Sequence, residues 1–379
     1  MDDVYKESLE LHKAHRGKIE VVSKVPLENK HDLSLAYTPG VAQACREIGA
    51  NQEDVYTYTS KGTMVAVVSD GSAILGLGNL GAHAAIPVME GKAALFKKFA
   101  GVDAFPICVN TQDTEEIIAL VKNIAPVFGG INLEDISAPR CFEIEARLRA
   151  ELPIPVMHDD QHGTATVVLA GLINSLKLAG KNKETVKIVM SGAGAAGTAI
   201  TNLLLAYGFK NFIVCDTHGA IYEGRADLND DKKILASRTN PENHAGTLAE
   251  VLAGADIFIG VSKPGVLTPE MVKTMAEKPI IFALANPIPE IMPDLAKEAG
   301  AFIVATGRSD FPNQINNSLA FPGIFRGALD NRIKQFTEKM FLDAATALAG
   351  YVKNPTSDQV LPQAFDLGVV DAIKQVIRD

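Results

Sequence analysis

An α/β fold in two parts is predicted by the alternation of short apolar runs with helical segments along the chain. Strand-like runs such as Asp103–Val109 and Val186–Ser191 are each followed by a helical pattern, which is typical of parallel sheets. A length of 379 residues suggests two domains, and 47% apolar residues allow each a core. We expect an N-terminal α/β domain over residues 1–160. A doubly wound, Rossmann-type domain with a helical C-terminal tail is expected over residues 161–379.

Composition argues against several classes of function. A net charge of −9 argues against nucleic acid as a partner, and no apolar run is long enough to span a bilayer. The acidic start, MDDVYKESLE, lacks the apolar core of a signal peptide. The cysteines form no CxxC pair, as expected of reduced thiols in a cytoplasmic protein: Cys45, Cys108, Cys141 and Cys215.

The first forty residues contain a charged segment and a tyrosine at a turn. Residues 1–20 have the pattern of a charged, weakly amphipathic helix, which is usually a solvated face or a dimer contact. Thr38 is placed to cap a helix that begins with Pro39, so Tyr37 should lie just outside that helix. A tyrosine at such a turn is more often a packing residue than a catalytic one.

A lysine in a small-residue setting follows the first strand. Asp70-Gly71 predicts a hairpin turn and a returning strand over Ala73–Leu77, and a glycine-containing stretch then leads into a helix over His83–Phe99. Lys92 lies in this helix among small and apolar neighbours, which suggests partial burial. Burial lowers the pKa of a lysine and can make it a base. The alternative is a lysine whose amine reaches solvent.

Two acidic pairs follow neighbouring strands. In INLEDIS, Glu134 and Asp135 come at the end of a short apolar run, and in PVMHDDQHGT, Asp159 and Asp160 do the same. A helix is expected between the two pairs over Pro139–Leu152. Because the carboxyl ends of parallel strands meet at one edge of a sheet, both pairs should meet there. Carboxylate oxygens suit a hard divalent cation such as Mg²⁺ or Mn²⁺. The alternative is that these residues cap helices or remain solvated.

The second domain opens with a glycine loop. An apolar helix is expected over Gly163–Gly180, and VKIVMSGAGAAGTAI then predicts a strand, a glycine loop and a helix. The GxGxxG pattern lets a pyrophosphate approach the backbone at a helix N-terminus. The next strand ends with an aspartate, where a carboxylate binds ribose hydroxyls. The motif predicts a dinucleotide site made of Gly192, Ala193, Gly194, Ala195, Ala196, Gly197 and Asp216.

The remainder continues the doubly wound pattern. Strands are expected at DIFIGVS, PIIFALANP and AFIVATG, with helices between them and a helical chain from Phe325 onward. Asn286 follows one of these strands, and Asn316 and Asn317 follow the last one. Asparagine amides at strand ends can bind a substrate carboxylate or a nicotinamide; turn formation is the alternative.

A dinucleotide site beside a divalent-metal site points to oxidation of a hydroxy acid by hydride transfer. If the product is a β-keto acid, the metal can also stabilise the enolate left by loss of CO₂. Such a reaction needs a base for the hydroxyl proton and an acid for the enolate carbon. Lys92 and Tyr37 are candidates of the suitable chemical types.

The sequence resembles malic enzymes of the small prokaryotic type over essentially its whole length. The matching segments, in chain order, are SLAYTPGVA, SDGSAILGLGNLG, PVMEGKAALFK, NLEDIS, HDDQHGT, SGAGAAG, ALANPIPE and NNSLAFPG. The resemblance implies conversion of (S)-malate to pyruvate and CO₂ with NAD or NADP and Mg²⁺ or Mn²⁺. Decarboxylation of oxaloacetate is a further activity it suggests.

The resemblance also implies a role for each matched residue. These roles are metal ligand for Glu134, Asp135 and Asp160, orientation of the lysine for Asp159, base for Lys92, acid for Tyr37, and contact with substrate and nicotinamide for Asn286 and Asn317. One departure concerns the substrate carboxylate. The larger eukaryotic members carry an arginine where this chain has Ala73, so the asparagines, the metal or another basic residue must hold it.

Coenzyme choice and assembly are further expectations. Asp216 favours NAD, because a carboxylate repels a 2′-phosphate, whereas Thr217, Lys232 and Lys233 could assist NADP; use of both is expected. A homodimer is expected because the charged first helix suggests a partner surface. One alternative is a malolactic enzyme, which gives lactate and retains NAD. The other is a non-catalytic dinucleotide-binding sensor, which would need neither the base, the acid nor the acidic pairs.

Overall fold

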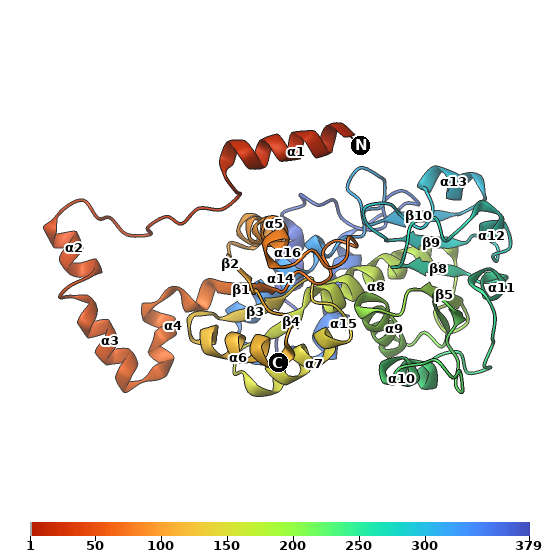
Figure 1. The fold of residues 1–379 in the computed structure, drawn as a ribbon. Helices are drawn as coiled ribbons and strands as arrows, with labels where there is room; N and C mark the ends of the chain where they lie inside the picture. The colour runs from red at the N-terminus through yellow and green to blue at the C-terminus, as the bar shows by residue number, and fades with distance from the viewer. Residues whose placement is uncertain (1) are drawn as a thin grey trace.

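The chain folds around two β-sheets (Figure 1). The computed structural model describes residues 2–379, and Met1 lies outside the described residues. The first sheet, in the order β2-β1-β3-β4, consists of β1 Met64–Ser69, β2 Asp103–Cys108, β3 Gly130–Leu133 and β4 Val156–His158. The second, in the order β10-β9-β8-β5-β6-β7, consists of β5 Lys187–Ser191, β6 Asn211–Asp216, β7 Gly219–Ala220, β8 Ile257–Gly260, β9 Ile280–Ala283 and β10 Ile303–Thr306. All strands except the short β7 are parallel, which confirms the predicted α/β fold class.

Helices cover both faces of the first sheet, which explains its continuous apolar strands. In β1, Val65 and Val67 face the core that includes α5 (Ala82–Ala100). Ala66 and Val68 face the opposite core. That second core is formed with α6 (Thr114–Ile124) and α7 (Arg140–Glu151).

The returning strand predicted over Ala73–Leu77 is wrong, because residues 70–81 form an irregular loop. Since β1 pairs in parallel with both of its neighbours, the chain must cross over through α5 instead of turning back. Asp70 Oδ1 accepts hydrogen bonds from the backbone nitrogen of Ser72 at 2.9 Å and from its hydroxyl at 2.6 Å. This local turn replaces the hairpin.

A 21-residue helix, α8 (Asp159–Ala179), follows β4 directly and leads to the second sheet. It is mostly buried and packs against α9 (Ala195–Tyr207) and α15 (Glu338–Tyr351). The helix therefore begins one turn before the predicted start at Gly163. Carboxylates are favourable in the first turn of a helix, so Asp159 and Asp160 belong to α8 and not to the strand end.

The last part of the chain returns to the first sheet. The remaining α-helices of the body are α10 Asp230–Arg238, α11 Leu248–Leu252, α12 Pro269–Lys273, α13 Pro293–Glu298, α14 Phe321–Asp330 and α16 Gly368–Lys374. Short 3₁₀ turns occupy Gln52–Asp54, Ser60–Thr63, Ala125–Val127 and Asn317–Leu319. Phe321 and Phe325 of α14 pack edge-on against Phe96 of α5, with ring centroids 4.7 and 5.4 Å apart. No helix in the described part of the chain is long and apolar enough to cross a membrane.

Residues 2–58, here called the arm, include a part that projects from the body (Figure 1), although Lys18 contacts Glu90 and Glu53 pairs with Arg332. The arm consists of α1 Asp2–His15, α2 Lys30–Ala36, α3 Val41–Ala50 and α4 Val55–Tyr58. No residue of α2, α3 or α4 is buried. The predicted cap at Thr38 is wrong, because α3 begins after Gly40. Hydrogen bonds from Gly40 N to Ser34 O and from Val41 N to Tyr37 O close a tight turn there instead.

Candidate active site

Lys92 projects from α5 into a buried acidic setting. Its Nζ lies 2.6 Å from Glu134 Oε1, 2.5 Å from Asp159 Oδ2 and 4.5 Å from the centroid of the Phe321 ring. The side chain is 7% exposed, so the predicted burial is confirmed. Burial alone would lower the pKa of Lys92, but the charges of Asp159, Glu134 and Asp160 outweigh it and raise that pKa. In this arrangement the lysine is protonated.

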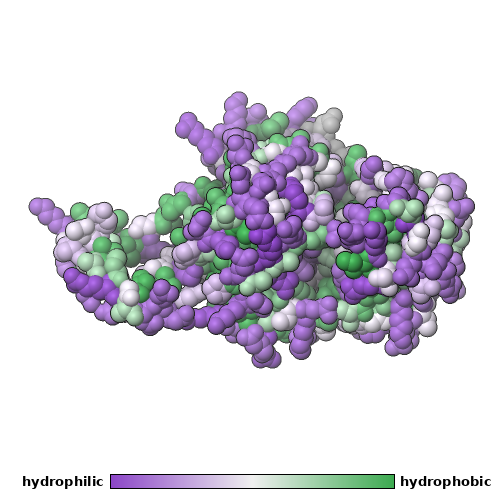
Figure 2. All heavy atoms as spheres, turned by 60° about the horizontal axis from the view of Figure 1, so that its bottom comes forward, coloured by the Kyte–Doolittle hydropathy of each residue, from purple (hydrophilic) through white to green (hydrophobic). Residues whose placement is uncertain are grey.

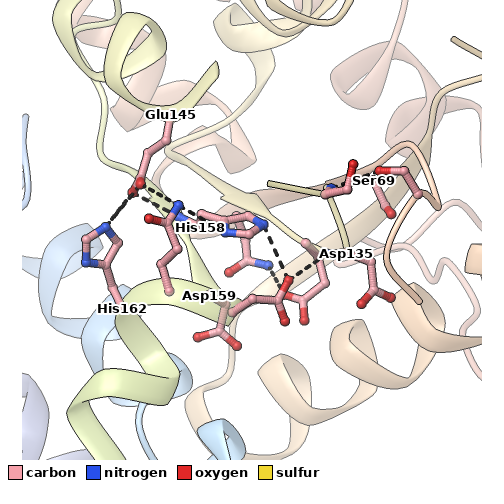
Figure 3. A network of polar contacts seen from close by, with 12 residues as sticks. Ser69, Asp135, Glu145, His158, Asp159 and His162 are labelled. Carbon is pink, nitrogen blue, oxygen red and sulfur yellow. Dashed lines mark hydrogen bonds and ion pairs between the residues drawn. The ribbon is translucent and has the colours of Figure 1, made fainter. Parts of the chain in front are cut away.

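Three carboxylates, here called the acidic corner, meet at the C-terminal edge of the first sheet. Glu134 and Asp135 follow β3, Asp160 lies in the first turn of α8, and one oxygen of each lies within 4.8 Å of the others. Burial, and then the charges of Asp160 and Glu134, raise the pKa of Asp135 to about 8. Oδ2 of Asp135 (Figure 3) is buried and has no hydrogen-bond partner among the residues that the structure describes. Mutually repelling carboxylates around an unpartnered oxygen fit a hard divalent cation.

Asp159 pairs with Lys92 and is not part of the acidic corner. It is fully buried, and burial raises its pKa to about 7. Its Oδ2 accepts from Lys92, whereas no described residue donates to its Oδ1. One turn further along α8, a Cβ added at Gly163 would lie 1.8 Å from that Oδ1. Only glycine leaves room for this carboxylate.

A cavity of about 440 Å³ lies beside these groups. Lys92 and the acidic corner line it from the first sheet, and Ala196, Asn286 and Asn317 line it from the second. Lys92 is the only cationic side chain among its described lining residues, and Ala73 is also in the wall. The structure thus brings the predicted base, cation site and asparagines together. The lining residues that the sequence reasoning did not assign include Thr164 and Phe321, which lie within matched segments, and Ser262, which does not.

The glycine loop lines a second hollow of about 870 Å³. Residues 191–194 contribute to its lining, and α9 begins directly afterwards at Ala195, so the free N–H groups of this helix lie beside the hollow. A Cβ at Gly197 would lie 1.9 Å from Gly192 O, so only glycine lets α9 pack this closely on the loop. This is the arrangement that binds the pyrophosphate of a dinucleotide.

Asp216 lines the same hollow, but both of its oxygens are already paired. Arg225 Nη1 lies 3.0 Å from Oδ1 and Nη2 2.5 Å from Oδ2, and Lys232 Nζ lies 2.6 Å from Oδ2. Although burial would raise the pKa of Asp216, these hydrogen bonds hold it well below its usual value. Lys232 lines the hollow, whereas Lys233 pairs with Asp230. Sequence reasoning missed Arg225, because its loop follows no periodic pattern.

Tyr37, the predicted acid, lies on the arm. It follows α2, is 67% exposed, and lines neither hollow. Its backbone nitrogen donates to Leu33 O at 2.9 Å. Figure 1 shows α2 near the far end of the arm, away from α5. Within one chain, Tyr37 and Lys92 therefore do not meet.

Two family models of malic enzymes match this chain. Residues 16–149 match the N-terminal domain of malic enzymes, and residues 161–374 match their NAD-binding domain. The bifunctional malic/malolactic enzyme of Bacillus subtilis strain 168 is 57% identical over 98% of this chain and 91% of that protein. The NAD-dependent malic enzyme of Geobacillus stearothermophilus is 58% identical over 95% of this chain and 76% of that protein. Relatives named NADP-dependent malic enzyme also match.

A solved structure gives the same result. The crystal structure of the NAD-dependent malic enzyme from Thermotoga maritima superimposes with a TM-score of 0.94 at 52% identity. The match covers 97% of this chain and 98% of that chain. The two matched domains follow one another and together span most of the sequence. The chain belongs to the malic enzyme family.

Proposed function

We propose that this chain oxidises and decarboxylates (S)-malate to pyruvate and CO₂, with reduction of NAD⁺ or NADP⁺ and with Mg²⁺ or Mn²⁺ bound. The observation that carries the proposal is the shared cavity, which Lys92 and the acidic corner line together with Ala196 and Asn286. A hydroxy acid in this cavity lies close to a proton acceptor, a cation site and a coenzyme site. Because loss of CO₂ follows hydride transfer, oxaloacetate should be decarboxylated at the same site.

The acidic corner would hold the divalent cation. Its three carboxylates converge, and the buried Oδ2 of Asp135 has no other partner in the described chain. The cation would supply Lewis-acid chemistry to the hydroxyl and carboxylate oxygens of malate. Thorough treatment with EDTA should abolish malate oxidation; activity that survives it would exclude a metal-dependent reaction.

Lys92 would take the hydroxyl proton while the hydride moves to the coenzyme. A lysine accepts a proton only when it is neutral, and the pKa of Lys92 is raised by the carboxylates around it. Two of these carboxylates, Glu134 and Asp160, belong to the acidic corner, so a cation bound there would offset part of this attraction, and burial also lowers the pKa. Asp159 lies outside the corner and keeps Nζ in place through its hydrogen bond.

The second half of the reaction breaks the bond to the leaving carboxylate and protonates the resulting enol carbon. Tyr37 would be the acid that supplies this proton. The amides of Asn286 and Asn317 line the cavity and would hold the malate carboxylate, because Ala73 offers no charge there.

We also propose a homodimer in which the arm of each subunit completes the site of the other. Helices α2 and α3 have seven and ten residues and bury none of them, and helices this short are unstable without packing. Figure 2 shows apolar side chains on the projecting arm; the exposed ones include Val21, Val22, Leu33, Leu35 and Tyr58. A second copy of the chain accounts for these side chains and for Tyr37 together, since a two-fold dimer can bring Tyr37 to the partner's Lys92.

A mixing experiment tests this exchange. Tyr37→Phe and Lys92→Ala each inactivate every site of their own homodimer. If the arms exchange, a mixed dimer has one site with both an intact lysine and an intact tyrosine. Random pairing of equal amounts should then restore about a quarter of wild-type activity. Activity no higher than that of the two parents would show that each chain uses its own tyrosine.

The malolactic reaction is the second candidate. One relative is named a bifunctional malic/malolactic enzyme, and the same site could reduce pyruvate if NADH stays bound. Malate, Mn²⁺ and NAD⁺ or NADP⁺ distinguish the two. Equal amounts of pyruvate and reduced coenzyme support the main proposal, whereas lactate without net reduced coenzyme supports the malolactic reaction.

Three further assignments complete the proposal. We expect both coenzymes to bind, because Arg225 and Lys232 compensate the charge of Asp216 that would otherwise repel a 2′-phosphate. Two domains, residues 1–160 and 161–379, would each be built on one sheet. A cytoplasmic location fits the four free cysteines, which suit a reducing compartment.

A further inference from the structure

A set of buried polar side chains lies behind the acidic corner and outside the cavity (Figure 3). His158 at the end of β4 is fully buried, and Glu145 of α7 and Gln161 of α8 are 5% and 6% exposed. None of the three lines the cavity around Lys92. The proposed reaction therefore gives them no direct part, yet they connect to one of its proposed ligands.

Glu145 and Gln161 fix which ring nitrogen of His158 carries the hydrogen. Glu145 Oε1 accepts a hydrogen bond from the backbone nitrogen of His158 at 3.1 Å. Gln161 Nε2 donates to Glu145 Oε2 at 3.1 Å and also lies 3.2 Å from His158 Nδ1. Because the amide nitrogen is a donor, Nδ1 must accept. The hydrogen of the neutral ring then lies on Nε2.

His158 Nε2 faces Asp160. The distance from Nε2 to Asp160 Oδ2 is 3.3 Å, slightly longer than a good hydrogen bond. The same Oδ2 accepts from the backbone nitrogen of Asp135 at 2.8 Å. No other acceptor for Nε2 is found among the described residues, and a buried donor without an acceptor is unfavourable. As the side chains stand, Nε2 makes no hydrogen bond, and a rotation of either side chain would bring Asp160 Oδ2 into range.

We propose that His158 is a positioning residue that holds Asp160 Oδ2, so that the other oxygen of this carboxylate is turned toward the cation. Glu145 and Gln161 stabilise the tautomer of His158 that carries its hydrogen on Nε2. No described residue donates to Asp160 Oδ1, which is therefore the oxygen left for a metal. Partners of this kind, behind a metal ligand, orient it and tune its affinity. The inference rests on the metal-dependent function proposed above.

Titration of the full-length protein with Mn²⁺ alone, followed by the EPR signal of free Mn²⁺, tests the role of His158. His158→Leu keeps apolar volume but removes the donor, and should weaken Mn²⁺ binding about 10–100-fold. His158→Gln, whose amide nitrogen can occupy the place of Nε2, should restore binding to within about threefold of wild type. His162→Leu is the matched control, because His162 also contacts Glu145 but stacks on Phe341 instead of facing Asp160. Its Mn²⁺ affinity should remain near that of wild type, and NADH binding should be unchanged in all three variants.

Equal Mn²⁺ affinity in wild type and His158→Leu would overturn the inference alone. Failure of the wild type to bind Mn²⁺ would overturn both the inference and the metal-dependent function. A second measurement needs no variant that could misfold: ¹⁵N NMR of the wild-type protein should show His158 neutral with its hydrogen on Nε2. A hydrogen on Nδ1 would contradict the proposed arrangement.

Discussion

The surroundings of Lys92 and the arm that carries Tyr37 are built in opposite ways. Lys92 is 7% exposed and is held by two carboxylates and an aromatic ring within its own chain. Tyr37 is 67% exposed and lies in a segment whose helices α2 to α4 bury nothing. The proposed base and the proposed cation site are thus both positioned by contacts within one chain. The position of the proposed acid depends on whatever the arm packs against.

The largest effect on activity should come from replacing the buried Lys92. Lys92→Ala should lower kcat for malate oxidation by about 10²–10⁴-fold, because it removes the base, while NADH binding stays near wild type. Tyr37→Phe should instead slow exchange of the pyruvate methyl protons with solvent, measured by NMR, more than it slows hydride transfer. Lys97→Ala is the control, since Lys97 lies on the same helix with its side chain 63% exposed. Equal loss of coenzyme binding and activity in Lys92→Ala would mean that the lysine is structural.

On the arm, loss of an exposed leucine should affect assembly. Leu35→Asp should raise the dimer dissociation constant about 10–100-fold, because burying a leucine contributes about 1.5–3 kcal/mol. Activity should fall on dilution, and analytical ultracentrifugation should show monomers. Leu295→Asp is the matched control, since Leu295 lies on α13 of the body and is 45% exposed. A wild-type protein that is monomeric at every concentration would contradict arm exchange.

The acidic corner should make metal binding depend on pH. Because the pKa of Asp135 is raised to about 8, the residue is mostly protonated at neutral pH and must lose a proton to bind a cation. Mn²⁺ affinity should therefore rise by up to about tenfold per pH unit below that pKa, with about one proton released at neutral pH. Calorimetry in two buffers of different ionisation enthalpy measures this release. Its absence would mean that Asp135 is already ionised.

The raised pKa of Asp135 also makes the stability of the metal-free protein depend on pH. The folded state binds this proton more tightly than the unfolded state, whose pKa is near the ordinary value of 3.8. The contribution to stability is therefore present at low pH and is lost as pH rises from that value to about 8. Added Mn²⁺ should raise the melting temperature most at the alkaline end of this range.

The smallest effect should come from a substitution in the coenzyme hollow, where Lys232 is less buried than Lys92 and less exposed than Tyr37. Lys232→Gln should raise KM for NADP⁺ about fivefold and KM for NAD⁺ less, because a partly exposed charge contributes little. Lys233→Gln is the control, since Lys233 pairs with Asp230. Steady-state kinetics with both coenzymes decide the outcome. An equal rise for both would mean that Lys232 acts only by holding Asp216.

The parts of the molecule that the sequence predicts well are those governed by local pattern. Apolar runs located the main strands, the spacing of Gly192, Gly194 and Gly197 located the second hollow, and strand order implied that Asp135 and Asp160 would meet. These features need only a period, a motif or a sheet edge.

The parts that were missed depend on contacts between distant segments. The strand expected at Ala73–Leu77 is a loop because pairing with β2 and β3 forces a crossover, which local turn chemistry does not reveal. Arg225 pairs with Asp216 through an irregular loop. The arrangement of His158 depends on Glu145 of a different helix. Tyr37 was identified by type, but no local pattern in the sequence places it relative to Lys92.

The close contact between Gly163 and Asp159, one turn apart in α8, also limits which amino acids the chain can accept at position 163. Every missense change in a glycine codon adds a side chain, and at Gly163 any Cβ would lie 1.8 Å from Asp159 Oδ1. Because Asp159 and Gly163 lie in the same helix, only a rotation of the Asp159 side chain could relieve the contact, and that rotation would break its hydrogen bond to Lys92. Random mutagenesis should therefore recover almost no active variants at codon 163. Codon 350 should accept many, since a Cβ at Gly350 meets no atom within 4 Å.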